Sequence, residues 1–127
     1  MKKIKIGITG CLGRMGQELI KAANKDKRIL VSSLTESKKS NKKINQLSIQ
    51  NNSIEAFKNT DVIIDFTTPE CTMQVLEIAS KLKKKIVIGT TGFNEKQENF
   101  INKLSKKISI LKSGNMSVGV NLLLYIT

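Results

Sequence analysis

The chain has 127 residues, 39% of them hydrophobic and 25% charged, which is the composition of one ordinary globular domain. No apolar run reaches the ~18–20 residues that span a membrane, and two cysteines without any histidine predict no metal site. The net charge of +12 comes mostly from lysines that are scattered along the chain, and only 4% of the residues are aromatic. We therefore expect no nucleic-acid or membrane partner. Two unpaired thiols and no leader-like apolar segment predict a cytoplasmic protein.

The first part of the chain predicts a strand, a turn, a helix and a second strand. The segment Ile4–Thr9 is short, apolar and β-branched, as in a buried strand. The stretch 10–16 is rich in glycine and predicts a turn. An amphipathic helix follows, with an apolar face formed by Met15, Leu19 and Ala23. The segment Ile29–Thr35 predicts the second strand and completes a βαβ unit.

The middle of the chain is less regular. Residues 36–52 are polar and rich in Lys, Asn and Ser, which predicts a mobile surface loop with one turn of order near Ile44 and Leu47. Residues 53–59 predict a short helix, and residues 62–66 predict a third buried strand.

The next helix has a clear start signal. In Thr68-Pro69-Glu70, a threonine cap precedes a proline at the first helical position and an acid at the positive end of the dipole. The apolar face of this helix is formed by Val75, Leu76, Ala79 and Leu82. The segment Lys85–Ile88 predicts a fourth strand.

The last third continues the alternation. Asn94 and Gln97 predict a capped helix start, and the buried face of that helix is formed by Phe100, Ile101 and Leu104. Residues 108–111 predict a fifth strand, and residues 118–126 an apolar helix in which the chain stops. The alternation predicts an α/β fold, a Rossmann-like doubly wound parallel sheet in three layers. We expect one domain over residues 1–127, incomplete at its C-terminal end.

The glycine-rich turn carries the first functional motif, with Gly10, Gly13 and Gly16 spaced as GxxGxxG. A pyrophosphate needs close backbone and N–H donors, which glycines and a helix beginning near Arg14 provide. This spacing differs from the commoner GxGxxG, but its place between a strand and a helix favours dinucleotide binding over a plain turn. Arg14 either lies along the phosphates or is solvated, and Cys11 is expected to fill space.

An acid, Glu36, follows the second strand 20 residues after Gly16. A carboxylate at this place can accept hydrogen bonds from the adenosine ribose, although an ordinary loop acid gives the same pattern. Lys38 and Lys39 can pair with a 2′-phosphate or remain solvated. The cofactor expected from these residues is therefore NADH or NADPH.

Polar residues follow three other strands. The stretch Gly89–Gly92 comes after the fourth strand, at the edge where open α/β sheets bind ligands, and its hydroxyls suit a ribose or a carboxylate unless it is a simple loop. Asn115 can fix a carboxamide or ribose, or cap a helix. Asp65 is expected to hold a loop at the end of its strand, and catalysis is the less favoured alternative.

Four stretches together resemble the dihydrodipicolinate reductases: GCLGRMG at 10–16, IDFTTPE at 64–70, VIGTTGF at 87–93 and NMSVGVN at 115–121. They occur in the family's order and spacing over essentially the whole chain, and the last two are the most specific. The resemblance implies hydride transfer from NADH or NADPH to a cyclic imine-type dicarboxylate, giving tetrahydrodipicolinate in lysine biosynthesis. It also implies a homotetramer for the full-length protein.

The resemblance implies roles for individual residues. The pyrophosphate would be lined by Gly10, Cys11, Leu12, Gly13, Arg14 and Met15. Glu36 would hold the adenosine ribose. The nicotinamide pocket would be formed by Gly89, Thr90, Thr91, Ser113, Gly114, Asn115 and Met116. Thr91 would also lie near the substrate carboxylate.

Two departures from the family pattern matter. Ser37 stands where some members carry an arginine for the NADP phosphate. The family's second domain, with its His-His-x-x-Lys stretch and the sheet that joins subunits, is not found in these residues, which contain no histidine. We therefore expect no catalytic residue in this chain and little turnover from it alone. A stand-alone NAD(P)-binding module without catalysis is the alternative, and another Rossmann oxidoreductase is a weaker one.

Overall fold

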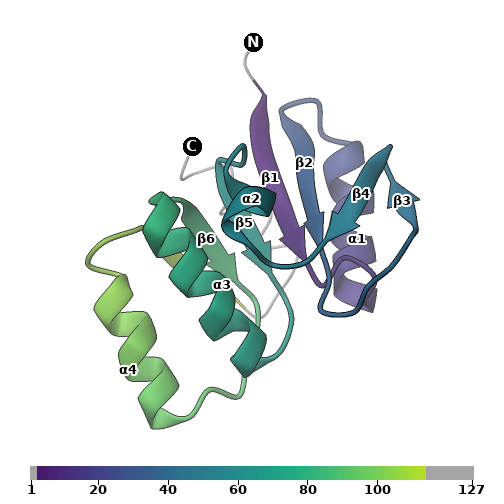
Figure 1. The fold of residues 1–127 in the computed structure, drawn as a ribbon. Helices are drawn as coiled ribbons and strands as arrows, with labels where there is room; N and C mark the ends of the chain where they lie inside the picture. The colour runs from purple at the N-terminus through teal and green to yellow at the C-terminus, as the bar shows by residue number, and fades with distance from the viewer. Residues whose placement is uncertain (1–2, 114–127) are drawn as a thin grey trace.

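The computed structural model describes residues 3–113 and shows a sheet covered by helices on both faces (Figure 1). Its strands are β1 (Ile4–Thr9), β2 (Ile29–Thr35), β3 (Lys43–Ile44), β4 (Leu47–Gln50), β5 (Val62–Asp65), β6 (Lys85–Ile88) and β7 (Ile110–Lys112). Its helices are α1 (Arg14–Asn24), α2 (Ile54–Phe57), α3 (Pro69–Leu82) and α4 (Glu95–Leu104). Each strand and helix predicted within this range is present.

The seven strands lie in the order β3-β4-β2-β1-β5-β6-β7, and only β3 and β4 pair antiparallel. The chain begins in the middle of the sheet with β1, moves outward to β2, and returns to the other side of β1 with β5. Such a reversal is the switch point at which open α/β sheets leave a crevice beyond the carboxyl ends of their strands. The predicted doubly wound parallel sheet is confirmed.

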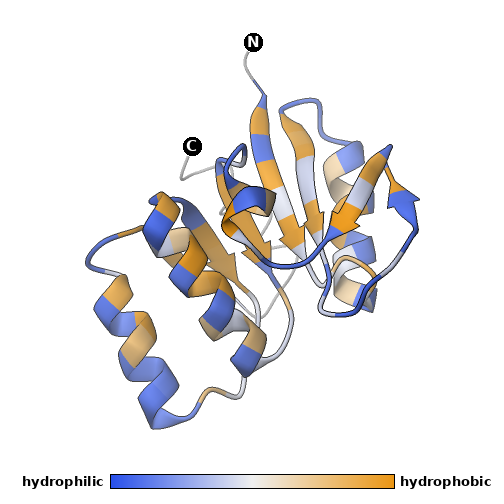
Figure 2. Ribbon diagram, in the orientation of Figure 1, coloured by the Kyte–Doolittle hydropathy of each residue, from blue (hydrophilic) through white to orange (hydrophobic). Residues whose placement is uncertain are grey.

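Two cores lie on opposite faces of the sheet, because successive residues of a strand point to opposite sides. In β5, Ile64 faces the core that contains α1, whereas Ile63 faces the core that contains α3 and α4. In β6, Val87 and Ile86 divide in the same way. The molecule therefore has three layers, and Figure 2 shows mostly apolar strands between helices of mixed polarity.

Helix starts follow the predicted capping chemistry. Thr68 Oγ1 accepts the N–H of Cys71 at 3.3 Å, and Pro69 is the first residue of α3. Asn94 and Gln97 exchange hydrogen bonds of 2.8 and 2.9 Å between side chain and backbone, which is a capping box at the start of α4. Both predicted starts are confirmed.

The surface loop predicted for residues 36–52 is wrong in its second half, where the chain forms the β3–β4 hairpin, although the turn of order expected near Ile44 and Leu47 is present between these strands. Asn45 and Gln46 turn the chain with φ values of 54° and 66°, the left-handed conformation of two-residue hairpin turns. Ile49 pairs with Leu34 of β2 and packs against the core on the α1 side, which holds the hairpin on the sheet. Asparagine tolerates this conformation, so Asn45 is compatible with a hairpin turn. The polar residues around it are equally typical of a loop, and the sequence therefore did not distinguish the two.

Strand β7 begins at Ile110, and the prediction of a start at residue 108 is wrong. The N–H of Ile108 still bonds to the carbonyl oxygen of Leu104, 3.1 Å away at the end of α4. The helix predicted for residues 118–126, and with it the C-terminal edge of the fold, lies outside the described residues. No helix in the described part of the chain is long and apolar enough to cross a membrane.

Candidate functional site

The candidate residues lie on loops that follow parallel strands, and these loops gather at the carboxyl edge of the sheet. The glycine-rich turn follows β1, Glu36 follows β2 and the stretch 89–92 follows β6. Ser113 follows β7, and its N–H donates to the carbonyl oxygen of Ile88 at 2.8 Å. Three of the candidate site residues, Gly114, Asn115 and Met116, lie outside the described range.

The turn after β1 requires glycine at two positions for different reasons. Gly10 has a φ of +59°, and a Cβ there would lie 2.7 Å from the methyl carbon of Thr67. Gly16 lies inside α1, where a Cβ would come within 2.3 Å of the Gly10 carbonyl oxygen. Helix α1 therefore packs directly on the turn that precedes it.

The N-terminus of α1 has no capping side chain. Helices α2, α3 and α4 each have a side-chain cap and an acid in the first turn, and the caps are Ser53, Thr68 and Asn94. Helix α1 begins after Gly13 with neither, alone among the helices of residues 3–113. Its first N–H groups and the positive end of its dipole are therefore available to an anion. Arg14 is exposed in the same turn and adds a positive charge.

Glu36 connects the end of β2 to the glycine-rich turn. Its Oε2 accepts the N–H of Leu12 at 3.1 Å, and its Oε1 accepts the N–H of Ser37 at 3.0 Å. The N–H of Glu36 donates to the carbonyl oxygen of Gln50 at 2.9 Å, so the hairpin supports this residue from the other side. The structure thus brings the predicted ribose acid and the predicted phosphate turn into direct contact.

Asp65, at the end of β5, is fully buried and accepts hydrogen bonds from threonine hydroxyls. Its Oδ1 accepts from Thr9 at 2.5 Å and from Thr67 at 2.7 Å. Its Oδ2 accepts from Thr72 of α3 and, at 3.4 Å, from Thr90. The prediction that Asp65 holds a loop is confirmed. Sequence reasoning missed Thr9 and Thr72, because a threonine in a strand or helix carries no functional signal by itself.

The loop after β6 lies at the same carboxyl edge of the sheet. A Cβ at Gly89 would lie 1.9 Å from the ring of Phe66, so this backbone needs glycine to pass close to the ring. The Thr90 hydroxyl is directed inward and accepts the N–H of Thr67 at 2.9 Å, whereas Thr91 is exposed. In this loop the Thr91 hydroxyl is the one that a ligand can reach.

Both cysteines are free and poorly suited to nucleophilic chemistry. Burial, and then the nearby Glu36 carboxylate, raise the pKa of the Cys11 thiol to about 11. Burial also raises the pKa of Cys71, whose sulfur lies 3.3 Å from the side-chain nitrogen of Asn52. Both thiols therefore stay protonated at neutral pH, and the buried Cys11 fills space as predicted.

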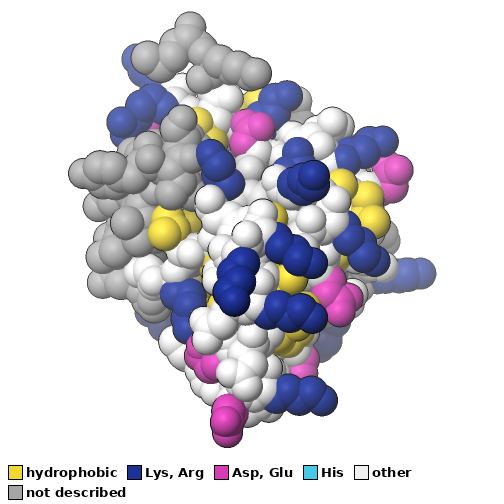
Figure 3. All heavy atoms as spheres, turned by 90° about the vertical axis from the view of Figure 1, so that its left-hand side faces the viewer, with side chains coloured by type: hydrophobic (Ala, Val, Ile, Leu, Met, Phe, Trp, Pro, Cys, Tyr) yellow, Lys and Arg dark blue, Asp and Glu magenta, His cyan; other side chains and the backbone are white. Residues whose placement is uncertain are grey.

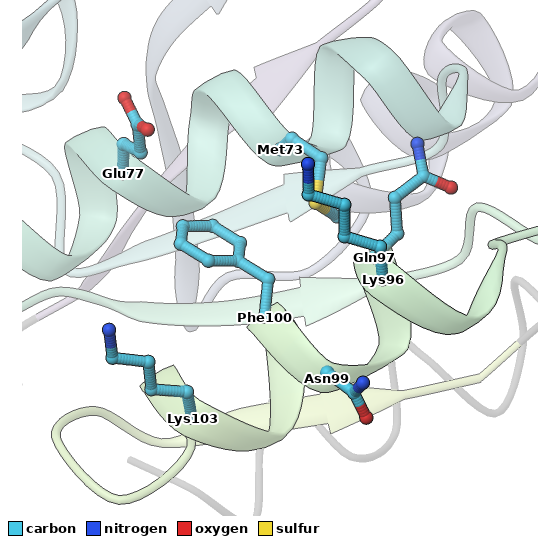
Figure 4. A pocket seen from close by; sticks show the side chains of 7 residues that line it. All are labelled: Met73, Glu77, Lys96, Gln97, Asn99, Phe100 and Lys103. Carbon is cyan, nitrogen blue, oxygen red and sulfur yellow. The ribbon is translucent and has the colours of Figure 1, made fainter.

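A groove between α3 and α4 lies apart from the loops at the carboxyl edge of the sheet. Its volume is about 430 Å³, and Figure 4 shows the side chains that line it, which are Met73, Glu77, Lys96, Gln97, Asn99, Phe100 and Lys103. All of these residues belong to the two helices rather than to the loops that follow the strands. The surface of this side of the molecule carries positive side chains interspersed with acidic ones (Figure 3).

The sequence matches a family model described as dihydrodipicolinate reductase, N-terminus, over residues 4–116. The 4-hydroxy-tetrahydrodipicolinate reductase of Pelagibacter ubique is 59% identical over 127 residues, which cover all of this chain and 49% of that protein. The protein of the same name from Buchnera aphidicola subsp. Schizaphis graminum is 43% identical, over 96% of this chain and 49% of that protein. The chain thus spans about half the length of the curated relatives it matches.

Solved structures share the fold. A dihydrodipicolinate reductase from Paenisporosarcina sp. TG-14, with dipicolinate bound, gives a TM-score of 0.68 at 23% identity, over 81% of this chain and 43% of that one. Homoserine dehydrogenase from S. aureus gives a TM-score of 0.71 at 17% identity, over 89% and 33%. At these identities the likeness establishes the fold alone.

Sequence similarity and geometry converge on the same part of the chain. The matched range contains the glycine-rich turn, Glu36, Asp65 and the stretch 89–92, which the fold brings to one edge of the sheet. The chain therefore belongs to the dihydrodipicolinate reductase family and corresponds to its N-terminal part.

Proposed function

We propose that residues 1–127 form one dinucleotide-binding domain, the cofactor-binding half of a 4-hydroxy-tetrahydrodipicolinate reductase. The reaction is the reduction of 4-hydroxy-tetrahydrodipicolinate to tetrahydrodipicolinate in lysine and diaminopimelate biosynthesis, with NADH or NADPH as the reductant. The open N-terminus of α1, behind a glycine-rich turn at the switch point of the sheet, is the observation that carries this proposal.

The residues at the carboxyl edge fit the adenosine and pyrophosphate parts of a dinucleotide. Gly13 and Arg14 are exposed at the start of α1, where backbone N–H groups can meet phosphate oxygens. Glu36 lies at the end of β2 beside Leu12, the place from which an acid reaches the adenosine ribose. We assign the pyrophosphate to the turn and the ribose to Glu36.

We assign the nicotinamide side to the loop after β6. Gly89 and Thr90 offer backbone at the edge of the crevice, and Thr91 offers an exposed hydroxyl for the nicotinamide or for a substrate carboxylate. Ser113 borders the same edge at the end of β7. We also assign Gly114, Asn115 and Met116, which lie outside the described residues, to nicotinamide binding. A bound nicotinamide supplies the hydride, while these residues bind it and orient it.

The proton donor comes from outside this chain. Reduction needs an acid whose pKa lies near the working pH, and the chain contains no histidine. Asp65 is buried and its oxygens accept threonine hydroxyls, and the raised pKa values of Cys11 and Cys71 make both thiols poor donors. We therefore expect little turnover from this chain alone. The general acid, the dicarboxylate clamp and the tetramer contacts belong to the other half of the full-length enzyme, which we place in the cytoplasm.

The choice between NADH and NADPH depends on the turn after Glu36. A 2′-phosphate near this carboxylate is repelled by it, and Ser37 offers no positive charge. Lys38 and Lys39 are exposed, and their flexible side chains can reach a phosphate. We propose that both dinucleotides bind, and that Lys38 and Lys39 strengthen the binding of NADPH but not the binding of NADH.

Titration of the chain into NADH and, separately, NADPH tests the proposal by nicotinamide fluorescence, because the chain has no tryptophan to interfere. We expect saturable binding of both. Glu36→Ala should weaken both about tenfold or more, since a lost charge-assisted hydrogen bond costs about 1.5–3 kcal/mol. Substituting Lys38 and Lys39 together by alanine should weaken NADPH only. Glu77→Ala, on the exposed side of α3, is the matched control, and a folded chain that binds neither dinucleotide would contradict the proposal.

A further inference from the structure

Asp65 and the hydroxyls of Thr9, Thr67, Thr72 and Thr90 form a buried unit, the threonine cluster. Its members come from the end of β1, the turn after β5, the first turns of α3 and the loop after β6. Burying a carboxylate is costly unless its oxygens accept hydrogen bonds. Each oxygen of Asp65 accepts two hydroxyls, which stabilises the carboxylate at a fully buried position.

The threonine cluster reaches both sides of the crevice. On the side of the glycine-rich turn, the Thr67 methyl carbon lies so close to Gly10 that an added Cβ would be 2.7 Å away. On the side of the loop after β6, Thr90 donates to Asp65 and accepts the N–H of Thr67. The N–H of Gly89 also donates to the carbonyl oxygen of Asp65 at 2.7 Å. Asp65, in the strand between β1 and β6, therefore connects the end of β1, which leads into the glycine-rich turn, with the loop after β6.

We infer that Asp65 is a positioning residue that sets the spacing between the pyrophosphate side and the nicotinamide side of the crevice. The inference rests on the proposed function, and the fully buried Asp65 would act through the threonines that contact it. Asp65→Asn keeps the shape of the side chain but replaces an acceptor oxygen with a donor group. If that donor group faces Thr90, the Thr90 hydroxyl must reorient while it still accepts the N–H of Thr67. The loop after β6 then moves relative to the glycine-rich turn.

A comparison of two ligands tests this role. NADH spans both sides of the crevice, whereas ADP occupies only the ribose and pyrophosphate side. In Asp65→Asn we expect NADH binding to weaken about tenfold and ADP binding less than about threefold, because the amide nitrogen cannot accept the two hydroxyls that the replaced oxygen accepted. Asp61→Asn is the matched control, since Asp61 is exposed at the opposite end of β5 and accepts the N–H of Lys5 at 2.9 Å. Equal losses for NADH and ADP, or no loss for either, would overturn the inference.

Amide hydrogen exchange in the ligand-free chain gives a readout that does not depend on nucleotide binding. Asp65→Asn should speed exchange at Thr67 and Gly89 relative to Ile8 in the central strand, and Asp61→Asn should not. Unchanged exchange at these amides in a folded Asp65→Asn chain overturns the inference whether or not NADH binds. The two claims can fail independently. If exchange is faster in Asp65→Asn but the unsubstituted chain does not bind NADH, the spacing role is supported and the proposed function is contradicted. If Asp65→Asn does not fold, Thr90→Val removes one hydroxyl of the cluster, and the same outcomes apply.

Discussion

Helix propensity and packing make opposite predictions for Gly16→Ala. At an exposed position in a helix, alanine is favoured over glycine by about 1 kcal/mol. At Gly16, however, the new Cβ would lie 2.3 Å from the Gly10 carbonyl oxygen and 2.8 Å from the Cys11 Cα. Carbon and oxygen atoms normally stay about 3.3–3.6 Å apart, so α1 or the turn must shift by about 1 Å. Overpacking of this kind costs about 1–3 kcal/mol, and this site lies at the upper end because the crowded neighbours are backbone atoms. After the gain of about 1 kcal/mol from helix propensity, we expect the free energy of unfolding to fall by about 2 kcal/mol.

The free energy of unfolding from urea titrations, followed by far-ultraviolet circular dichroism, measures this loss without a tryptophan signal. Gly13→Ala is the matched control, because its Cβ would lie 3.2 Å from the same carbonyl oxygen. Its expected cost is about 1 kcal/mol or less, the usual penalty of alanine at a helix cap. If Gly16→Ala were as stable as the parent chain, or more stable, the close packing of α1 on the turn would be refuted.

Three further outcomes follow from other parts of the structure. Folding raises the pKa of the Cys11 thiol from 9.0 to about 11, so the thiol loses its proton on unfolding when the pH lies between these values. The free energy of unfolding should therefore fall as the pH rises from about 9 to about 11. The fall should be smaller in Cys11→Ala, which has no thiol at this position. Asn94→Ala removes the capping box of α4 and should cost about 1 kcal/mol in the urea assay, whereas Asn102→Ala on an exposed site of the same helix should not. Gln46→Gly relieves a φ of 66° and should raise the free energy of unfolding by about 1 kcal/mol, and a decrease would contradict the hairpin turn.

The parallel sheet and the helix starts could be predicted because their signals are local. Strands buried on both faces are continuous apolar runs, and Ile4–Thr9 and Lys85–Ile88 have the predicted bounds. Caps depend on side chains within a few residues, as Thr68 shows. The hairpin was harder, because its short strands alternate Leu47 and Ile49 with polar residues that also suit a loop.

Contacts within the candidate site depend on strand order, which no local pattern specifies. Thr9 and Asp65 are 56 residues apart and meet because β1 pairs with β5. Glu36 meets Leu12 because β2 pairs with β1 on its other side. Sequence analysis could therefore nominate the glycine-rich turn and Glu36 separately, but it could not assemble the threonine cluster.

Nuclear magnetic resonance can locate bound NADH residue by residue. Proton–nitrogen correlation spectra of the labelled chain should show NADH-dependent shifts at the backbone N–H groups of Arg14, Glu36 and Thr91. The N–H groups of Asp61, at the amino end of β5, and of Phe100, in the α3–α4 groove, should stay unchanged. Shifts centred on the groove, or none at all in a folded chain, would contradict dinucleotide binding at the carboxyl edge of the sheet.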